Sequence, residues 1–220
     1  MYILHGVDDW GSLVVHMMLE ELGVPFRFCP VEYETGGLQA PEFRALNPFG
    51  KVPVLETPDG TIHETAAILL YLAERHGALM PAADSPERVR FLIWFALLTN
   101  QIHPQCLLLL HPDWMGLDDA DIEVAASAHK ALLSLLDAAE AEAARAPAWL
   151  SASEVSVVSL WLVMMLRWMR LFPPFPEHRI MTSAYPSLLA IAQGIEARPA
   201  IARVLAREGL AADALSASAE

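Results

Sequence analysis

Hydrophobic positions in the first part of the chain follow two periods, one typical of strands and one typical of helices. Short apolar and β-branched runs fit strands, apolar residues spaced three or four apart fit helices, and glycines or prolines stand between them. The pattern predicts strands at residues 2–4, 25–33, 52–56 and 61–63. It predicts helices at residues 12–22, 40–46 and 65–76. The chain therefore begins with a mixed domain in the order strand, helix, strand, helix, strand, strand, helix.

The pattern changes beyond residue 86, where every periodic segment is helical. The predicted helices cover residues 87–110, 121–146, 157–172, 186–197 and 199–208. Residues 157–172 are apolar on all sides, which is typical of a helix buried in a core, whereas the tail from residue 211 is expected to fray. The two halves predict an α+β chain with a thioredoxin-like domain at residues 1–78, a linker at 79–86 and an all-helical domain at 87–220.

Composition narrows the classes of function. The 220 residues carry a formal net charge of −13, which argues against nucleic acid or an anionic membrane as a partner, because those need clustered Lys and Arg. Met1 leads into apolar residues without a basic leader, and no apolar run reaches membrane-spanning length, so we expect a soluble cytoplasmic protein. Cys29 and Cys106 lack the spacing of a disulfide framework or a zinc site, and no metal-binding motif appears, so no metal is expected.

A proline-framed turn is the strongest candidate for chemistry. Residues 47–55 read Asn-Pro-Phe-Gly-Lys-Val-Pro-Val-Leu, and Pro53 removes a backbone donor, so the segment is not an ordinary central strand. A cis Val52-Pro53 bond is one way to turn the backbone there. Such a bend leaves the amide and carbonyl of Val52 unpaired, so a peptide-like ligand can pair with them as a short extra strand would.

Glu64 and Thr65 precede a strong helical pattern, so a helix N-terminus lies beside this bend. A helix N-terminus binds carboxylates, and an acidic side chain next to it can hold an ammonium group. The alternative is structural: Thr65 merely caps its helix, and Glu64 is a solvated acid. The bend at Val52 favours ligand binding.

These segments resemble the glutathione-binding half of the cytosolic glutathione transferase family. The resemblance rests on residues 47–48, 50–55, 64–68 and 71–72. It implies that the Val52 backbone pairs with the cysteinyl part of glutathione, that Glu64 and Thr65 hold its γ-glutamyl group, and that Lys51 and Pro53 belong to the same site. Weaker matches at residues 149–150, 156, 185–188 and 198–201 extend the resemblance over nearly the whole chain. The family usually places Asp three residues after the position of Ser156, where this chain has Ser159.

The reaction that the resemblance implies is attack of the glutathione thiolate on an electrophilic carbon. Lowering a thiol pKa from about 8.5 by two units takes about 2.7 kcal/mol of preferential stabilisation, more than a helix end supplies. Trp10, Gly11 and Ser12, with His16, resemble the bacterial beta-like branch, in which a cysteine commonly stands where this chain has Gly11. Ser12 is therefore the candidate thiolate donor. Its alternative role is a plain helix N-cap, and the amides of Gly11 and Ser12 can also serve a thiolate.

Further contacts come from the resemblance alone. Residues 101–104 resemble a Glu-Leu/Ile-His-Pro stretch whose histidine faces the active cleft in the family, which makes His103 a candidate contact of glutathione or substrate. A helix histidine of this kind is otherwise a packed or solvated residue. The electrophile pocket is expected between the domains, lined by Trp10 and Trp114.

The function that follows is that of a glutathione transferase in detoxification, acting as a homodimer that conjugates glutathione, its co-substrate, to a small hydrophobic electrophile. Two alternatives stay open. The same site supports glutathione-dependent isomerisation or dehalogenation. Because the usual Cys or Tyr is missing, a non-catalytic ligand carrier or interaction protein with this fold is the second alternative.

Overall fold

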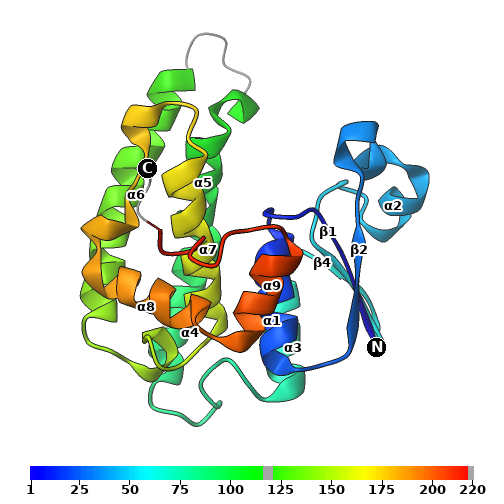
Figure 1. Cartoon of the computed structure of the whole chain (residues 1–220), viewed down its shortest axis with the longest axis horizontal. Coiled ribbons are helices and arrows are strands. Elements are labelled where there is room, and N and C mark those ends of the chain that lie inside the picture. Colours follow the sequence, from blue (N-terminus) through cyan, green and yellow to red (C-terminus); the bar gives the residue numbers. More distant parts are fainter. Residues whose placement is uncertain (116–120, 218–220) are drawn as a thin grey trace. The chain divides into compact units, whose positions relative to one another are not determined.

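The computed structural model describes residues 1–115 and 121–217, without the side chains of residues 114, 115 and 121. Its contacts divide the chain into two compact units (Figure 1). The first contains Met1–Ala78 together with Arg198–Ala212, and the second contains Leu79–Ala197 together with the residues from Asp213 onward.

The first unit is built on a four-stranded mixed sheet. Its strands are β1 (Tyr2–Gly6), β2 (Phe26–Pro30), β3 (Val54–Thr57) and β4 (Gly60–His63), in the order β2-β1-β3-β4. β1 runs parallel to β2 and antiparallel to β3, and β3 and β4 form an antiparallel hairpin. The register places Leu4 beside Leu55, so two fully buried side chains meet at the centre of the sheet. This is the predicted thioredoxin-like order.

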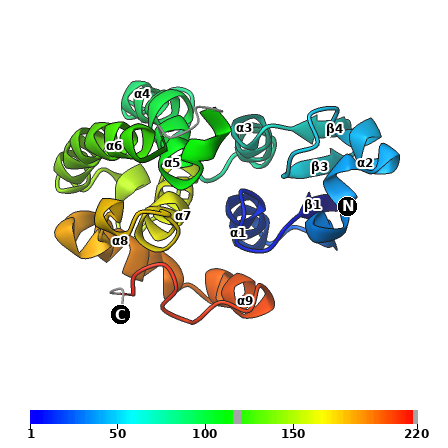
Figure 2. The ribbon, with the colours of Figure 1, turned by 90° about the horizontal axis from the view of Figure 1, so that it is seen from above.

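Helices cover the sheet from both sides. α1 (Ser12–Leu22) and α3 (Thr65–His76) lie on one face, and α2 (Pro41–Leu46) lies on the other (Figure 2). Both α1 and α3 end at a glycine in the left-handed conformation, as the sequence predicts. The predicted strand at residues 25–33 is shorter than expected, because the last ladder bond runs from the Val31 amide to the Gly6 carbonyl and a 3₁₀ turn begins at Tyr33.

The last helix belongs to the first unit, although the sequence pattern alone assigned it to the helical domain. α9 (Pro199–Arg207) packs on α1. Arg198 donates two bonds of 2.9 Å to the carboxylate of Glu21, and Arg203 pairs with Glu20 at 2.9 Å. A guanidinium that donates two hydrogen bonds to one carboxylate fixes the orientation of the two side chains as well as their distance. The partners lie at opposite ends of the sequence, so local periodicity carries no sign of them.

The second unit is a helical bundle around α7 (Val157–Leu171). Every residue of α7 from Val157 to Arg170 is buried, as expected for a helix that is apolar on all sides. Its packing partners are α4 (Arg88–Leu97), α5 (His103–Leu110) and α8 (Pro186–Glu196), while α6 (Asp121–Ala143) packs on α5 and α8.

The predicted helix at residues 87–110 is continuous but changes its winding. A π-helical turn, Leu98–Ile102, joins α4 to α5 just before Pro104. Proline has no amide to donate and clashes with the carbonyl four residues earlier, and a wider turn accommodates both defects.

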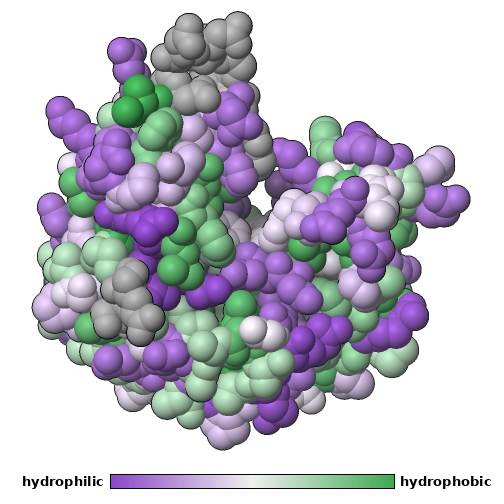
Figure 3. All heavy atoms as spheres, turned by 45° about the horizontal axis from the view of Figure 1, so that its top comes forward, coloured by the Kyte–Doolittle hydropathy of each residue, from purple (hydrophilic) through white to green (hydrophobic). Residues whose placement is uncertain are grey.

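The continuous helix Arg88–Leu110 is long and apolar enough to cross a membrane by length and composition alone. Core helices of soluble proteins pass the same test. On the face drawn in Figure 3, hydrophilic and hydrophobic side chains are interspersed.

The start of α7 carries a complete capping box made from two serines. The Ser159 amide donates to the Ser156 hydroxyl oxygen at 3.2 Å, and the Ser156 amide donates to the Ser159 hydroxyl oxygen at 2.9 Å. The Ser156 hydroxyl donates to the Trp149 carbonyl at 2.6 Å. Serine at position 159 therefore completes the box without a carboxylate.

We predict that Ser156→Ala lowers the free energy of unfolding by about 1 to 3 kcal/mol, because it leaves buried backbone groups without partners. Urea denaturation measures the change. Ser153→Ala, at an exposed position in the preceding loop, is the control and should change stability by less than about 0.5 kcal/mol. Equal effects of the two substitutions would show that the box contributes nothing specific.

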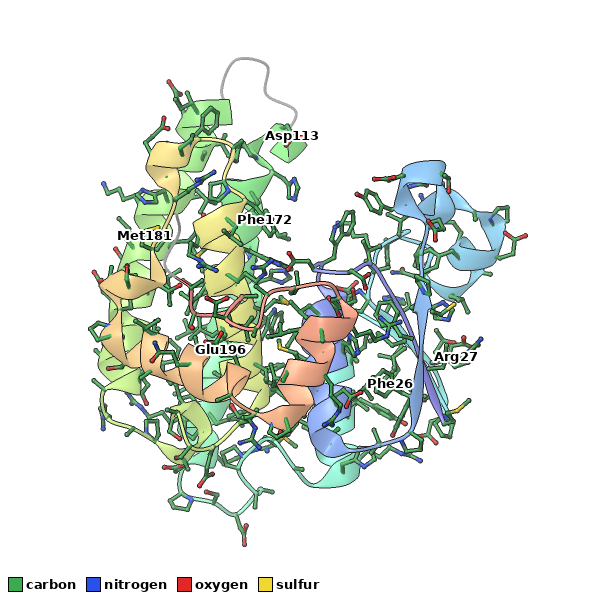
Figure 4. The ribbon with its side chains drawn as sticks, viewed as in Figure 1. Phe26, Arg27, Asp113, Phe172, Met181 and Glu196 are labelled. Carbon is green, nitrogen blue, oxygen red and sulfur yellow. The ribbon has the colours of Figure 1, made fainter. Side chains whose placement is uncertain are left out.

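Part of the tail expected to fray is held by charged side chains of α7 and α8. Arg167 and Arg170 of α7 donate to the Ala214 carbonyl at 3.1 and 2.8 Å. Glu196 at the end of α8, labelled in Figure 4, accepts from the amides of Leu215 and Ser216 at 3.2 and 3.1 Å. The expectation of fraying is thus wrong for residues 213–217, since periodicity does not reveal contacts made by an irregular segment.

Candidate functional site

Asn47 builds the turn that leads into the predicted ligand-binding bend. Its side-chain amide donates to the Lys51 carbonyl at 2.7 Å, and its side-chain oxygen accepts from the Phe49 amide at 3.0 Å. Gly50 has a φ of +60°, and a Cβ there would lie 2.7 Å from the Leu38 carbonyl oxygen. The turn therefore requires both Asn47 and Gly50, which explains the Asn-Pro-x-Gly spacing in physical terms.

The bend itself has the predicted form. The Val52-Pro53 peptide bond is cis. β3 begins only at Val54, which pairs with His5 and His63, so Val52 lies outside the ladder. Val52 is half-buried and Lys51 is exposed.

Glu64 occupies the position immediately before α3, and its backbone is unusual. Its φ of +73° is uncommon for a residue with a side chain, and such conformations cost about 1 to 3 kcal/mol and cluster at functional sites. Its side chain is 69% exposed and lies 3.5 Å from Nδ1 of His63. Because Glu64 is the cap residue, the alternative that Thr65 N-caps the helix is wrong.

Gly11 is where the predicted segments meet. A Cβ added at Gly11 would lie 3.5 Å from Cδ of Pro53, 3.8 Å from Oγ1 of Thr65 and 3.8 Å from the Val52 carbonyl oxygen. The loop before α1, the cis bend and the start of α3 therefore converge on one spot. These distances are ordinary van der Waals contacts, so a side chain fits there and the absence of one is not imposed by space.

The Ser12 side chain is held inside the loop that precedes α1. The cap residue of α1 is Gly11, so the expectation that Ser12 is the N-cap is wrong. The buried Ser12 hydroxyl donates to the Val7 carbonyl at 2.6 Å and accepts from the Val7 amide at 3.0 Å. Its only proton is thus engaged inside the loop. The amides of the first turn of a helix, by contrast, have no acceptor within that helix.

A buried carboxylate that the sequence analysis missed reaches the same loop. Glu208, just after α9, accepts from the Asp9 amide at 2.8 Å and lies 2.6 Å from Nδ1 of His16. The side chains of His16 and Glu208 are both fully buried. No local motif marks Glu208, because its partners lie almost the whole chain away.

The predicted pocket residues fall in different parts of the chain. Trp10 packs against Tyr33 with ring centroids 4.8 Å apart, so two partly exposed aromatic rings lie together in the first unit. His103 belongs to the second unit, where its ring lies 5.3 Å from Trp161 and 6.3 Å from Trp168. The side chain of Trp114 lies outside the described residues.

The cysteines do not offer a reactive thiol at this spot. Cys106 is fully buried in α5, and burial raises the pKa of its thiol far above the ordinary value, so the group stays protonated and unreactive. Cys29 lies on β2, where it pairs with His5 of β1. Among the described residues, no three His, Cys, Asp or Glu side chains gather as metal ligands would.

Comparisons with known proteins place the chain in a family. Residues 12–75 match the family "Glutathione S-transferase, N-terminal domain". Glutathione S-transferase 3 of Zea mays is 30% identical over 213 residues, which cover 92% of both chains. A sphingomonad glutathione S-transferase solved with glutathione is 30% identical, with a TM-score of 0.74 over 95% of this chain and all of its own. The bacterial beta-class enzyme of Sphingomonas chungbukensis is 32% identical, with the same TM-score over 95% of this chain and all of its own.

Proposed function

Because this chain belongs to the glutathione S-transferase family, we propose that it binds glutathione and conjugates the thiol sulfur to a small hydrophobic electrophile. The observation that carries the proposal is the convergence on Gly11 of the cis Val52-Pro53 bend and Thr65. A backbone edge, a helix N-terminus and an exposed carboxylate then lie within reach of one tripeptide.

In the proposed complex the cysteinyl and γ-glutamyl parts of glutathione each have a matching group. The backbone of Val52 pairs with the cysteinyl residue as an added strand would. The γ-glutamyl carboxylate lies at the N-terminus of α3 beside the Thr65 hydroxyl, and the γ-glutamyl ammonium lies at the Glu64 carboxylate. Lys51 and Pro53 flank the bend and belong to the same proposed site.

We propose that the thiolate is held by the first amides of α1, those of Gly11 and Ser12. A bond to a charged group contributes about 1.5 to 3 kcal/mol and a helix end about 0.3 to 1 kcal/mol, which together reach the roughly 2.7 kcal/mol that two pKa units require. The thiol proton leaves to solvent, and the sulfur lone pair forms the new bond to the electrophilic carbon. In a substitution the leaving group departs from that carbon with its bonding pair, and in an addition the π pair moves to the neighbouring atom, which takes a proton from solvent. In this arrangement the Ser12 hydroxyl hydrogen-bonds the Val7 backbone and so stabilises the loop, while the Ser12 amide donates to the sulfur.

A titration of reduced glutathione by calorimetry, with ultraviolet detection of bound thiolate across pH, tests the proposal. Binding with a thiol pKa below about 8.5 supports a transferase and justifies a screen of electrophiles. Binding with an unshifted pKa would favour a ligand carrier, and absence of binding would overturn the glutathione site altogether.

We also propose that the protein forms a cytoplasmic homodimer through α4. Val89, Leu92 and Ile93 lie within one turn of that helix and are 69%, 43% and 52% exposed. Exposed apolar residues gathered on one helix mark an interaction surface more often than singly scattered ones do.

The double substitution Leu92→Glu with Ile93→Glu should raise the dimer dissociation constant by at least about 100-fold, because carboxylates would be buried against apolar side chains. Sedimentation across a range of protein concentrations measures it. Leu133→Glu on α6, at another exposed leucine, is the control and should leave the dimer intact. Unchanged dimerisation of the double variant would exclude the α4 surface.

A further inference from the structure

Two consecutive residues at the end of α9, Arg207 and Glu208, contact the loop before α1. One oxygen of Glu208 accepts from the Asp9 amide at 2.8 Å, and the other lies 2.6 Å from Nδ1 of His16. The adjacent Arg207 places its guanidinium carbon 4.2 Å from the centroid of the Phe28 ring and lies 3.9 Å from a carboxylate oxygen of Asp8. Phe28 in turn packs against the His16 ring, with centroids 5.2 Å apart.

Asp9 needs such a hold. Its φ is +58°, the left-handed conformation that residues with a side chain adopt at a cost. A fully buried carboxylate accepting the amide of that residue favours this conformation, because release of the amide would leave a buried carboxylate oxygen without its donor. The loop is therefore anchored twice, at Val7 by the Ser12 hydroxyl and at Asp9 by Glu208.

We infer that Glu208 is a positioning residue for thiol activation, acting through the Asp9 amide and His16 on the direction of the Gly11 and Ser12 amides. The inference rests on the proposed function, since it concerns the amides assigned to the thiolate. A donor that shifts by a fraction of an ångström loses much of its effect on a developing charge, so the loop must be held as firmly as the helix. Glu208 and Asp9 are separated by 199 positions in the sequence, so only the folded chain brings them together.

The hold on the loop is tested without glutathione by hydrogen exchange of the Asp9 amide. Glu208→Met keeps the length of the side chain but removes both oxygens, whereas Glu208→Gln keeps one acceptor oxygen for Asp9. We expect Glu208→Met to speed exchange at residues 7–11 by at least about tenfold and Glu208→Gln to speed it much less. Arg198→Ala is the matched control, because it loosens α9 from α1 at the Glu21 pair without touching the loop.

Equal exchange at residues 7–11 in Glu208→Met and Arg198→Ala would overturn the inference, since Glu208 would then only dock α9. Glu208→Asp withdraws the carboxylate by one methylene and replaces Glu208→Met if that variant does not fold, with the same expected direction. Urea denaturation of each variant shows that the exchange is read on folded protein.

The link to chemistry is read from the pKa of the bound glutathione thiol. Glu208→Met should move this pKa upward toward about 8.5 and lower kcat more than it raises KM, whereas Arg198→Ala should leave the pKa in place. An unshifted thiol pKa in Glu208→Met would overturn the positioning role. If the unsubstituted protein binds no glutathione, the proposed function fails, and the hydrogen-exchange result still decides whether Glu208 holds the loop.

Discussion

Glutathione affinity should fall by about 10- to 100-fold when Glu64 is replaced by Gln, with little change in the stability of the protein. The ammonium of a γ-glutamyl group needs an anion, and a bond between charged groups contributes about 1.5 to 3 kcal/mol that a neutral amide only partly replaces. The Glu64 side chain is largely exposed next to the start of α3, so its carboxylate is accessible to a ligand. Calorimetric titration with reduced glutathione measures the loss.

The matched control is Glu74→Gln, which removes the same charge from an exposed position at the other end of α3. It should leave the affinity within about twofold, because charges this far from the ligand are screened. Equal losses in both variants would mean that only net charge matters, and an unchanged affinity in Glu64→Gln would remove Glu64 from the site.

Ser12→Ala should lower the free energy of unfolding by about 2 to 4 kcal/mol, the second large effect. The hydroxyl satisfies both the amide and the carbonyl of Val7, and each buried group left without a partner costs about 1 to 3 kcal/mol. Turnover per folded molecule should fall only modestly if the Ser12 amide, and not its hydroxyl, acts on the thiol. Urea denaturation and initial rates corrected for the folded fraction separate the two.

The exposed Ser183 provides the control, because Ser183→Ala removes the same hydroxyl without orphaning a buried group. Its stability should change by less than about 0.5 kcal/mol. A Ser12→Ala variant that folds normally yet loses turnover by more than about 100-fold would return the hydroxyl to the thiol and argue against the amides.

Much of the fold is readable from local pattern, because the forces that set each element are local. Gly23 and Gly77 end α1 and α3 where the apolar periodicity stops, and the buried helix α7 is recognisable from its unbroken apolar run. The placement of α9 is not readable in this way. Its attachment depends on the ion pair between Arg198 and Glu21. The local sequence around either residue does not indicate which residue is its partner.

The candidate site divides in the same manner. Pro53 limits the backbone enough for the cis bend to be foreseen, and the structure confirms it. The alternative that Ser12 and Thr65 are helix caps is wrong, because in both helices the cap is the preceding residue, Gly11 or Glu64. The role of Asn47 in the turn could have been predicted from the sequence, since Asn-Pro followed by Gly is a turn signature. Glu208 was not, because only the folded chain brings it to Asp9.

The division of the first unit between the two ends of the chain bears on how the protein is made. Residues 1–78 leave the ribosome first, but residues 198–212 complete their unit only after the entire helical unit has been synthesised. Until then the side of α1 that α9 covers is exposed to solvent, and Glu20 and Glu21 have no arginine to pair with from residues 198–212. Residues 1–78 are thus not the whole of their unit, and a chain that ends before α9 lacks the helix that packs on α1.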